Sequence, residues 1–166
     1  MIPELFTPRL RLRAFSPDDL DAWAAIVADP AVMRFIGNGG PVERDVAWRL
    51  MAFHLGEWAL RGRGNWAVER RADGMLIGRV GFLQPEGWPG EEMAWLFARP
   101  AWGQGYATEA VRAAIAHGRR WLGAGPLISL IRPDNAPSIR LAERVSAHFE
   151  KKVHFLESVA QQYRHP

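Results

Sequence analysis

Two short apolar runs, residues 93–98 and 127–131, flank a long amphipathic segment, and this arrangement constrains the fold more than any other feature of the chain. The amphipathic segment continues to Trp121 and is preceded by two glycines, Gly103 and Gly105. Apolar runs of this length are typical of buried strands. Two strands joined by a helix pair in parallel through a right-handed crossover. The sequence therefore predicts an α/β fold built on a central parallel strand pair.

The rest of the chain predicts a mixed sheet in which antiparallel neighbours are the majority. Asp73-Gly74 between two strand-like runs is a strong hairpin signal, and Ser16-Pro17 has the residue types of a helix start. Gly78 and Gly81 within a strand indicate a bulge or a close approach of backbone. The expected elements are a strand over 9–13, a helix from Ser16 to about Asp29, a helix over about 41–60, a hairpin of Asn65–Arg70 with Met75–Leu83, and two closing strands within 152–163. About four helices would flank this sheet in one domain, residues 1–166.

The residues Trp102 to Glu109, which read Trp-Gly-Gln-Gly-Tyr-Ala-Thr-Glu, join the first apolar run to the amphipathic segment. The first amides of a helix lack intrahelical acceptors and lie at the positive end of the helix dipole. Such an end binds phosphate or pyrophosphate readily. Spacing alone is equally consistent with a glycine-rich turn that binds no ligand.

A second motif, Pro133-Asp134-Asn135-Ala136-Pro137-Ser138, follows the second apolar run. Together with Glu92-Met93-Ala94-Trp95 and the stretch Trp102 to Ala110, it resembles the signature of the GNAT superfamily of acetyl-CoA-dependent N-acetyltransferases. The branch that it is most similar to contains the ribosomal-protein N-terminal acetyltransferases. Pro8 to Arg13 also looks like the first strand of that family, so the resemblance covers nearly the whole chain.

The resemblance implies a sheet splayed open at the parallel pair, with acetyl-CoA as co-substrate and the amine meeting it in the splay. It also implies that the amides of the glycine turn hold the pyrophosphate, and that a backbone N–H near Phe97 holds the thioester oxygen. The cofactor-binding residues that we expect are Phe97, Ala98, Gly103, Gln104, Gly105, Tyr106, Ala107, Thr108, Asn135 and Ser138. Trp102 stands where the superfamily has Arg or Gln, a departure that is usual in this branch. It weakens the expectation of a side-chain contact with the cofactor at that position, but not the assignment of the turn as a whole.

Glu92 is the candidate general base. Acetyl transfer needs an unprotonated amine, but α-amines with a pKa near 8 are largely protonated at neutral pH. A carboxylate can accept that proton, directly or through water. Strand alternation puts Glu92 on one face with Ala94 and Leu96, where loss of water would raise its pKa. The alternative is a solvent-facing glutamate beside Glu91, and Asp134 is a weaker rival that fits an ordinary turn or cap.

Ser138 and Asn135 complete the set of candidate catalytic residues. Relatives often use a tyrosine to protonate the departing sulfur, but the chain has only Tyr106, within the glycine turn, and Tyr163. A hydrogen bond from Ser138 to the developing thiolate is therefore the expected contact. Asn135 is expected to cap the following helix, and the resemblance adds a contact with the pantetheine arm or with active-site water. The simpler role of Ser138 is that of a polar residue in the first turn of that helix.

Composition narrows the classes of protein. The chain of 166 residues is 48% apolar, without a stretch long enough to span a bilayer or a secretion signal, so we expect no membrane partner and a cytoplasmic location. It has no cysteine, and its five histidines lack ligand-like spacing, which predicts no disulfide and no metal site. The net charge of +3 is scattered over the chain, so a nucleic-acid partner has little support.

Two further features carry open alternatives. Trp66, Trp88 and Trp95 are candidates for lining a substrate pocket, although core packing is the default for each. Relatives commonly place glycine after the last helix, where this chain has Val145-Ser146-Ala147. Ser146 must then either take a left-handed conformation or end the helix in another way.

The most direct interpretation is an N-acetyltransferase that transfers an acetyl group from acetyl-CoA to a primary amine. The acceptor is a protein N-terminus or an amine-bearing small molecule, because one scaffold serves many acceptors. The alternative is an acyl-CoA sensor that binds the cofactor without turnover. A second copy of the chain, forming a homodimer, is a further candidate partner.

Overall fold

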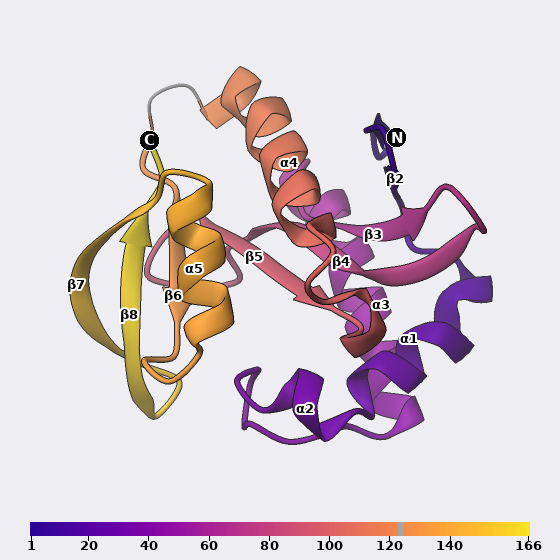
Figure 1. Ribbon diagram of the computed structural model, residues 1–166, viewed down its shortest axis with the longest axis horizontal. Coiled ribbons are helices and arrows are strands. Elements are labelled where there is room, and N and C mark those ends of the chain that lie inside the picture. Colours follow the sequence, from indigo (N-terminus) through magenta and orange to yellow (C-terminus); the bar gives the residue numbers. More distant parts are fainter. Residues whose placement is uncertain (123–124) are drawn as a thin grey trace.

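The computed structural model describes residues 1–122 and 125–166, and the strands of this part form one sheet in the order β1-β2-β3-β4-β5-β6-β8-β7 (Figure 1). All neighbours are antiparallel except β5 and β6, which are parallel as predicted. The strands are β1 (Leu5–Phe6), β2 (Leu10–Arg13), β3 (Asn65–Arg70), β4 (Met75–Leu83), β5 (Glu92–Phe97), β6 (Ile128–Ile131), β7 (His148–Phe155) and β8 (Ser158–Arg164).

The described residues form five α-helices, one more than expected. They are α1 (Leu20–Val27), α2 (Pro30–Met33), α3 (Arg44–Arg61), α4 (Tyr106–Leu122) and α5 (Ala136–Arg144), with short 3-10 turns at Pro17–Asp19 and Arg99–Ala101. The additional helix is α2, a single turn that starts where the Asp29 side chain accepts a hydrogen bond from the Ala31 amide. None of the helices in this part of the chain combines the length and apolarity needed to cross a bilayer.

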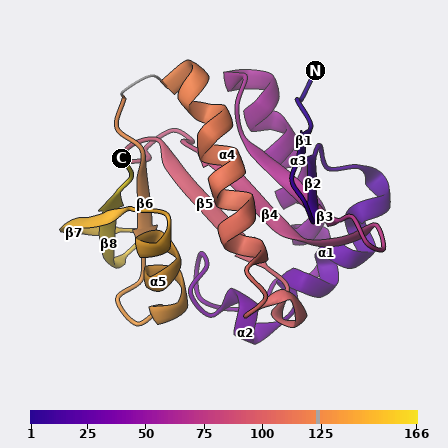
Figure 2. The same cartoon turned by 45° about the horizontal axis from the view of Figure 1, so that its top comes forward.

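The helices cover both faces of the sheet and bury a separate apolar cluster on each. Figure 2 shows α4 lying across β4 and β5 on one face. The cluster beneath it joins α4 and α5 to strand residues such as Met93 and Phe97. On the other face, α1, α2 and α3 bury Leu96 together with Trp23 and Met51. The alternation of side chains predicted for the Glu92 strand is therefore confirmed, since Leu96 and Met93 belong to different clusters.

The sheet opens between β5 and β6. Glu92 and Ile128 are the register pair that joins these two strands, and the Ile128 amide donates to the Glu91 carbonyl at 2.9 Å. Beyond this point the strands diverge, and β6, β8 and β7 lead away from β5 with α5 packed beside them (Figure 1). The splayed parallel pair implied by the family resemblance is thus present.

Side chains satisfy the backbone groups that the open sheet would leave unpaired. In a continuing parallel ladder, the Leu130 amide would donate to the Met93 carbonyl. The Leu130 amide instead donates to Glu92 Oε1 at 3.3 Å, and the Met93 carbonyl accepts from Ser129 Oγ at 2.7 Å. Because buried backbone groups are costly to leave unpaired, these two side chains stabilise the opening.

Two glycines of β4 allow the sheet to pack closely, as the sequence indicated. A Cβ atom on Gly78 would lie 2.2 Å from the Leu96 carbonyl oxygen, and one on Gly81 would lie 2.3 Å from the Gly64 carbonyl oxygen. The register of β3 against β4 also shifts beside Gly78, between Val68 and Glu69. A side chain at either glycine would therefore push the backbones apart.

Ser146 resolves the open question about the end of α5 by taking the left-handed conformation, with φ of 67°. The strand that follows begins at His148, earlier than the expected start near Lys152. Its side chains are mostly exposed, so it lacks the apolar alternation by which strands are identified. The helix predicted from Ser16 to Asp29 is likewise divided into a 3-10 turn and α1.

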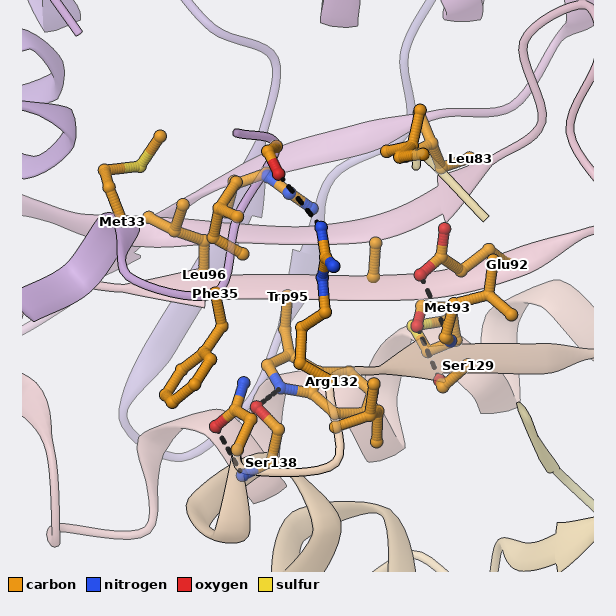
Figure 3. A pocket seen from close by; sticks show the side chains of 18 of the residues that line it. Met33, Phe35, Leu83, Glu92, Met93, Trp95, Leu96, Ser129, Arg132 and Ser138 are labelled. Carbon is orange, nitrogen blue, oxygen red and sulfur yellow. Dashed lines mark hydrogen bonds between the residues drawn. The ribbon is translucent and has the colours of Figure 1, made fainter. Parts of the chain in front are cut away.

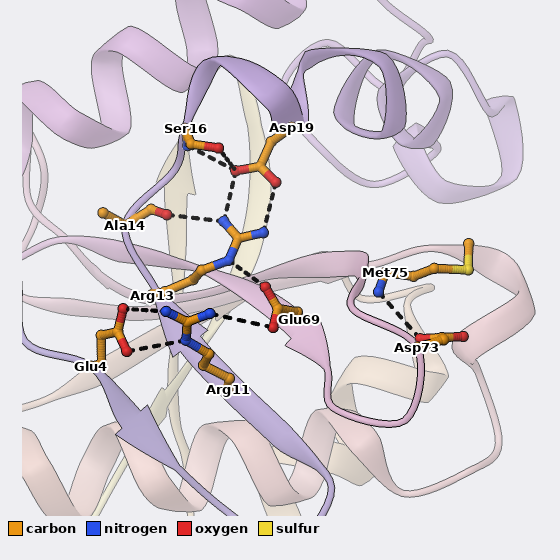
Figure 4. Close-up of polar contacts among 9 residues, drawn as sticks. All are labelled: Glu4, Arg11, Arg13, Ala14, Ser16, Asp19, Glu69, Asp73 and Met75. Atoms are coloured by element: carbon orange, nitrogen blue, oxygen red, sulfur yellow. Dashed lines mark hydrogen bonds and ion pairs between the residues drawn. The ribbon is translucent and has the colours of Figure 1, made fainter.

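The N-terminal strand is fixed to its neighbours by a network of ion pairs (Figure 4). Arg13 on β2 forms two hydrogen bonds with the Asp19 carboxylate, at 2.7 and 2.8 Å, and one with Glu69 on β3 at 2.6 Å. Arg11 joins Glu4 to Glu69 in the same way. The pKa of Asp19 lies below its usual value, because hydrogen bonds from Arg13 and Ser16 outweigh the effect of burial. This network anchors the start of α1, which forms one wall of the cavity described next.

Candidate active site

A cavity of about 260 Å³ lies where β5 and β6 separate. Its walls come from α1, α2 and α3 on one side and from β6, α5 and the β7–β8 hairpin on the other. Figure 3 shows Glu92, Trp95 and Leu96 from β5 at this cavity, with Ser129 beside Glu92 and Met93, and Ser138 beside Trp95. Aromatic side chains make up much of the lining, namely Trp23, Phe35, Phe53, Trp88, Trp95 and Phe155. The structure thus brings Glu92, Asn135 and Ser138 to one cavity.

Glu92 lies at the vertex of the splay and is 8% exposed. One carboxylate oxygen accepts a hydrogen bond from Trp88 Nε1 at 2.6 Å, and the other accepts from the Leu130 amide. Burial raises the pKa of Glu92 to about 7, and the hydrogen bonds and the nearby Arg79 charge only partly oppose that shift. A carboxyl group with such a pKa exchanges its proton near neutral pH. The expected desolvation of Glu92 is therefore present, whereas Asp134 is exposed and does not line the cavity.

Ser138 and Asn135 lie at the first turn of α5. The Asn135 side chain accepts a hydrogen bond from the Ser138 amide at 3.4 Å, so Asn135 caps the helix as predicted. Ser138 Oγ accepts from Trp95 Nε1 at 3.1 Å. Because the hydroxyl accepts from the indole, its own hydrogen is available to a group in the cavity.

The glycine turn has two left-handed glycines and leaves the first amides of α4 without helical acceptors. Gly103 and Gly105 have φ of 74° and 80°, in the left-handed region. The first α4 hydrogen bond runs from the Glu109 amide to the Gly105 carbonyl at 3.1 Å. The amides of Tyr106, Ala107 and Thr108 therefore precede the helical ladder and lie at the positive end of the helix dipole.

A clamp from the N-terminal segment holds this turn in place. Arg9 donates to the Gln104 carbonyl at 2.8 Å and pairs with Glu109 at 2.7 Å, and its guanidinium lies 4.5 Å from the centre of the Tyr106 ring. The Glu109 carboxylate also accepts from Thr7 Oγ1 at 2.6 Å. The turn is thus fixed before any ligand binds, which lowers the entropy cost of binding.

The end of β5 presents one of its two expected backbone donors to the splay. The Ala98 amide donates to the Ile77 carbonyl on β4 at 2.8 Å, so that N–H is already engaged within the sheet. Donors alternate along an antiparallel ladder, and the Phe97 amide therefore points away from β4, toward the open side. The Phe97 carbonyl accepts from Trp102 Nε1 at 2.8 Å, which connects the end of β5 to the glycine turn.

Two polar residues that line the cavity and are buried, Arg79 and His54, were not among the expected site residues, although His54 lies on a helix whose apolar residues on several sides are consistent with core packing or with a face along a substrate cleft. Burial lowers the pKa of His54 well below its usual value, with the Arg79 charge contributing, so the imidazole is neutral at pH 7. The sequence signal that could have identified them as cavity residues is a polar side chain that faces inward on an otherwise apolar strand or helix. Of the tryptophans considered, Trp88 and Trp95 line the cavity, and Trp66 is completely buried in the core.

The comparisons with known proteins agree with this geometry. The acetyltransferase (GNAT) domain model matches residues 9–148. YkkB, an uncharacterized protein of Bacillus subtilis strain 168, is 30% identical over 158 residues, which cover 90% of this chain and 88% of that protein. An acetyltransferase of Agrobacterium tumefaciens C58 has a similar crystal structure, with a TM-score of 0.87, 28% identity, and coverage of 100% of this chain and 95% of that one.

A more distant neighbour shows the fold with a ligand. The RimJ protein of Mycobacterium smegmatis, in complex with CoA-disulfide, has a TM-score of 0.76 at 19% identity, and the match covers 93% of this chain and 80% of that one. At this level of identity the likeness concerns the fold alone. The family model, in contrast, spans the splayed strands, the glycine turn and the cap of α5. On that match the chain belongs to the GNAT family of acetyltransferases.

Proposed function

We propose that the protein transfers an acetyl group from acetyl-CoA to a primary amine, with Glu92 as the general base. The observation that carries the proposal is a buried carboxylate with a pKa of about 7, placed where the sheet opens into an aromatic cavity. An α-amine has a pKa near 8. Because the two values are close, Glu92 can take the ammonium proton at neutral pH without a large energy difference.

The residues of the chain suit acetyl-CoA as co-substrate. The pyrophosphate would meet the amides from Gly103 to Thr108, where two left-handed glycines and the start of α4 leave donors without helical acceptors. RimJ of Mycobacterium smegmatis, which has this fold, was crystallised with a CoA-disulfide. When bound, the co-substrate supplies the thioester, and the protein supplies the proton acceptor and the hydrogen-bond donors around it.

Three groups of the chain divide the work of transfer. Glu92 accepts a proton from the ammonium, and the freed nitrogen bonds to the acetyl carbon while the carbon–sulfur bond breaks. The Phe97 amide donates to the carbonyl oxygen as negative charge builds there, a type of contact whose loss costs about 10²- to 10³-fold in rate. The Ser138 hydroxyl donates a hydrogen bond to the departing sulfur. The nitrogen loses a second proton as the amide forms, and this proton converts the thiolate of the leaving CoA into the thiol.

The test compares Glu92→Gln with Asp134→Asn, which removes one carboxylate from an exposed position nearby. Acetyl transfer to a panel of amines and acetyl-CoA binding by calorimetry are measured for both variants and the wild type. We expect kcat/KM of Glu92→Gln to fall by roughly 10²- to 10⁴-fold with cofactor affinity retained, and Asp134→Asn to behave as the wild type. Binding of acetyl-CoA without transfer to any amine would contradict the proposal and favour an acyl-CoA sensor. The cytoplasmic location and the homodimer stay predictions.

A further inference from the structure

Arg79 on β4 is a buried cation that forms no direct ion pair with any residue that the structure describes. It is 8% exposed and lines the cavity. Its Nη1 donates to Asn65 Oδ1 at 3.0 Å, and Asn65 is fixed in turn by a bond from its Nδ2 to the Phe82 carbonyl at 3.0 Å. Within the described residues, Asn65 is the one hydrogen-bond partner of the Arg79 guanidinium, which forms no direct ion pair there. Since a guanidinium has five N–H donors, most of them are unused.

No acidic group among the described residues forms a direct ion pair with this guanidinium, and the charged form of Glu92 acts on it only through space. Both oxygens of Glu92 are occupied by Trp88 and Leu130. His54, which packs on the same side, is neutral at pH 7. Burial lowers the pKa of Arg79 only to about 10, with the Glu92 charge opposing the shift, so the guanidinium remains charged. A buried, unpaired charge is expensive, which makes an anionic ligand group favourable here.

The sheet places Arg79 and Glu92 on the same wall of the cavity. Arg79 pairs with Leu96 on β5, and Leu96 follows Glu92 by four residues on the same face of the sheet. The two backbone positions are therefore about 13 Å apart along the strands, with a cation at one end and the proposed base at the other. A molecule between them meets an acceptor for its ammonium group and a donor for an anion.

The remaining surface of the cavity sets the character of such a molecule. Trp23, Phe35, Phe53 and Trp88 present apolar surface around the two polar groups. The volume of about 260 Å³ is slightly below the range of about 300–1,000 Å³ that is common for small-molecule sites. A compact amine fits this space better than a long peptide.

We propose that Arg79 binds a carboxylate of the acceptor, so that the substrate is a small primary amine carrying a carboxylate and an apolar or aromatic group, as in an aromatic α-amino acid. This inference rests on the proposed acetyl transfer and specifies its acceptor. The transfer itself is unchanged: the nitrogen–carbon bond forms, the carbon–sulfur bond breaks, and Glu92 takes the ammonium proton. Arg79 determines specificity because it contacts the carboxylate and not the reacting atoms.

The test uses pairs of amines that differ only in the carboxylate, L-phenylalanine against 2-phenylethylamine and L-tryptophan against tryptamine. The kcat/KM of acetylation is measured for the wild type, for Arg79→Gln and for Arg49→Gln, which removes the same charge from an exposed position on α3. Hydrogen bonds to charged groups are strong enough that we expect the carboxylate to improve kcat/KM by roughly 10- to 100-fold in the wild type and in Arg49→Gln. In Arg79→Gln this preference should vanish, while transfer to the decarboxylated amine is retained.

Two outcomes separate this inference from the proposed function. Preference of the wild type for the decarboxylated amines, or an equal loss of both activities in a folded Arg79→Gln, would overturn the role of Arg79 and leave acetyl transfer intact. If no amine is acetylated, the proposed function fails, and calorimetry of L-phenylalanine then tests the site alone. Binding that depends on Arg79 would support the carboxylate site, and absence of binding would overturn it.

Discussion

Replacing Glu92 by glutamine should change the pH dependence of stability, independently of any activity. The pKa of Glu92 is raised from an ordinary 4.5 to about 7 by burial. A carboxyl group whose folded pKa is raised makes the folded state less stable as pH increases, because the charged form is harder to accommodate in the fold than in the unfolded chain. In the wild type this loss begins near pH 4.5 and is complete above pH 7. Glutamine carries no charge at any pH, so the variant cannot show this loss of stability.

The magnitude follows from the size of the shift. At about 1.4 kcal/mol per pKa unit, the charged form of Glu92 destabilises the fold by about 3 kcal/mol above pH 7. Glutamine has one amide oxygen, so it satisfies only one of the two donors, Trp88 Nε1 and the Leu130 amide. The lost hydrogen bond costs about 1 kcal/mol at every pH. Relative to the wild type, the variant should therefore gain about 2.5 kcal/mol between pH 5 and pH 8.

Urea denaturation of both proteins at half-unit steps between pH 5 and pH 8 measures this difference directly. Asp134→Asn, which removes an exposed carboxylate, should give a nearly constant difference over the same range. A constant difference for Glu92→Gln would refute the reasoning, since it would mean that the carboxyl group has an ordinary pKa in the folded protein. The assay needs neither cofactor nor acceptor, so it tests the electrostatics of the vertex alone.

Three more substitutions test other parts of the structure. Gly105→Glu should abolish acetyl-CoA binding in calorimetry, because φ of 80° disfavours a side chain and a carboxylate would repel the pyrophosphate; unchanged affinity would contradict the phosphate turn. Arg13→Gln should lower the free energy of unfolding at pH 7 by about 3 kcal/mol, because two largely buried carboxylates lose their partner. Since the pKa of Asp19 is lowered in the fold, wild-type stability falls as pH drops below about 4, and urea titrations should show a smaller fall in the variant. Ser146→Gly should raise Tm by about 2–4 °C by relieving the left-handed φ, and calorimetry that shows no gain would argue against strain there.

Local chemistry made part of this fold predictable. The hairpin of β3 and β4 has the bounds expected from Asp73-Gly74 and from the flanking apolar runs, because turn and strand signals lie within twenty residues. Asn135 caps α5 because its residue type and place before a helix suffice for that role. For Ser146 the sequence left two alternatives open. The structure shows the left-handed one, in which the amides of Ser146 and Ala147 donate back to the Glu143 and Ala142 carbonyls at the end of α5.

The features that escaped prediction depend on contacts between distant segments. The strand β7 begins early in a run of charged residues, since pairing with β8 forms it and no buried face marks it. Arg79 was visible only as one of many scattered arginines. Its importance lies in its burial at the cavity without a direct ion pair among the described residues, and only the assembled cavity reveals that.

The opening of the sheet and the raised pKa of Glu92 have one physical origin. A regular ladder would pair the Leu130 amide with the Met93 carbonyl, which would close the splay and leave no room for a substrate. The Glu92 carboxylate takes the amide and the Ser129 hydroxyl takes the carbonyl, so the strands can separate without an unpaired backbone group. To reach that amide, Glu92 must lie inside the sheet, where it loses water and its pKa rises. The carboxylate that keeps the cavity open is therefore poised, by the same placement, to accept a proton within it.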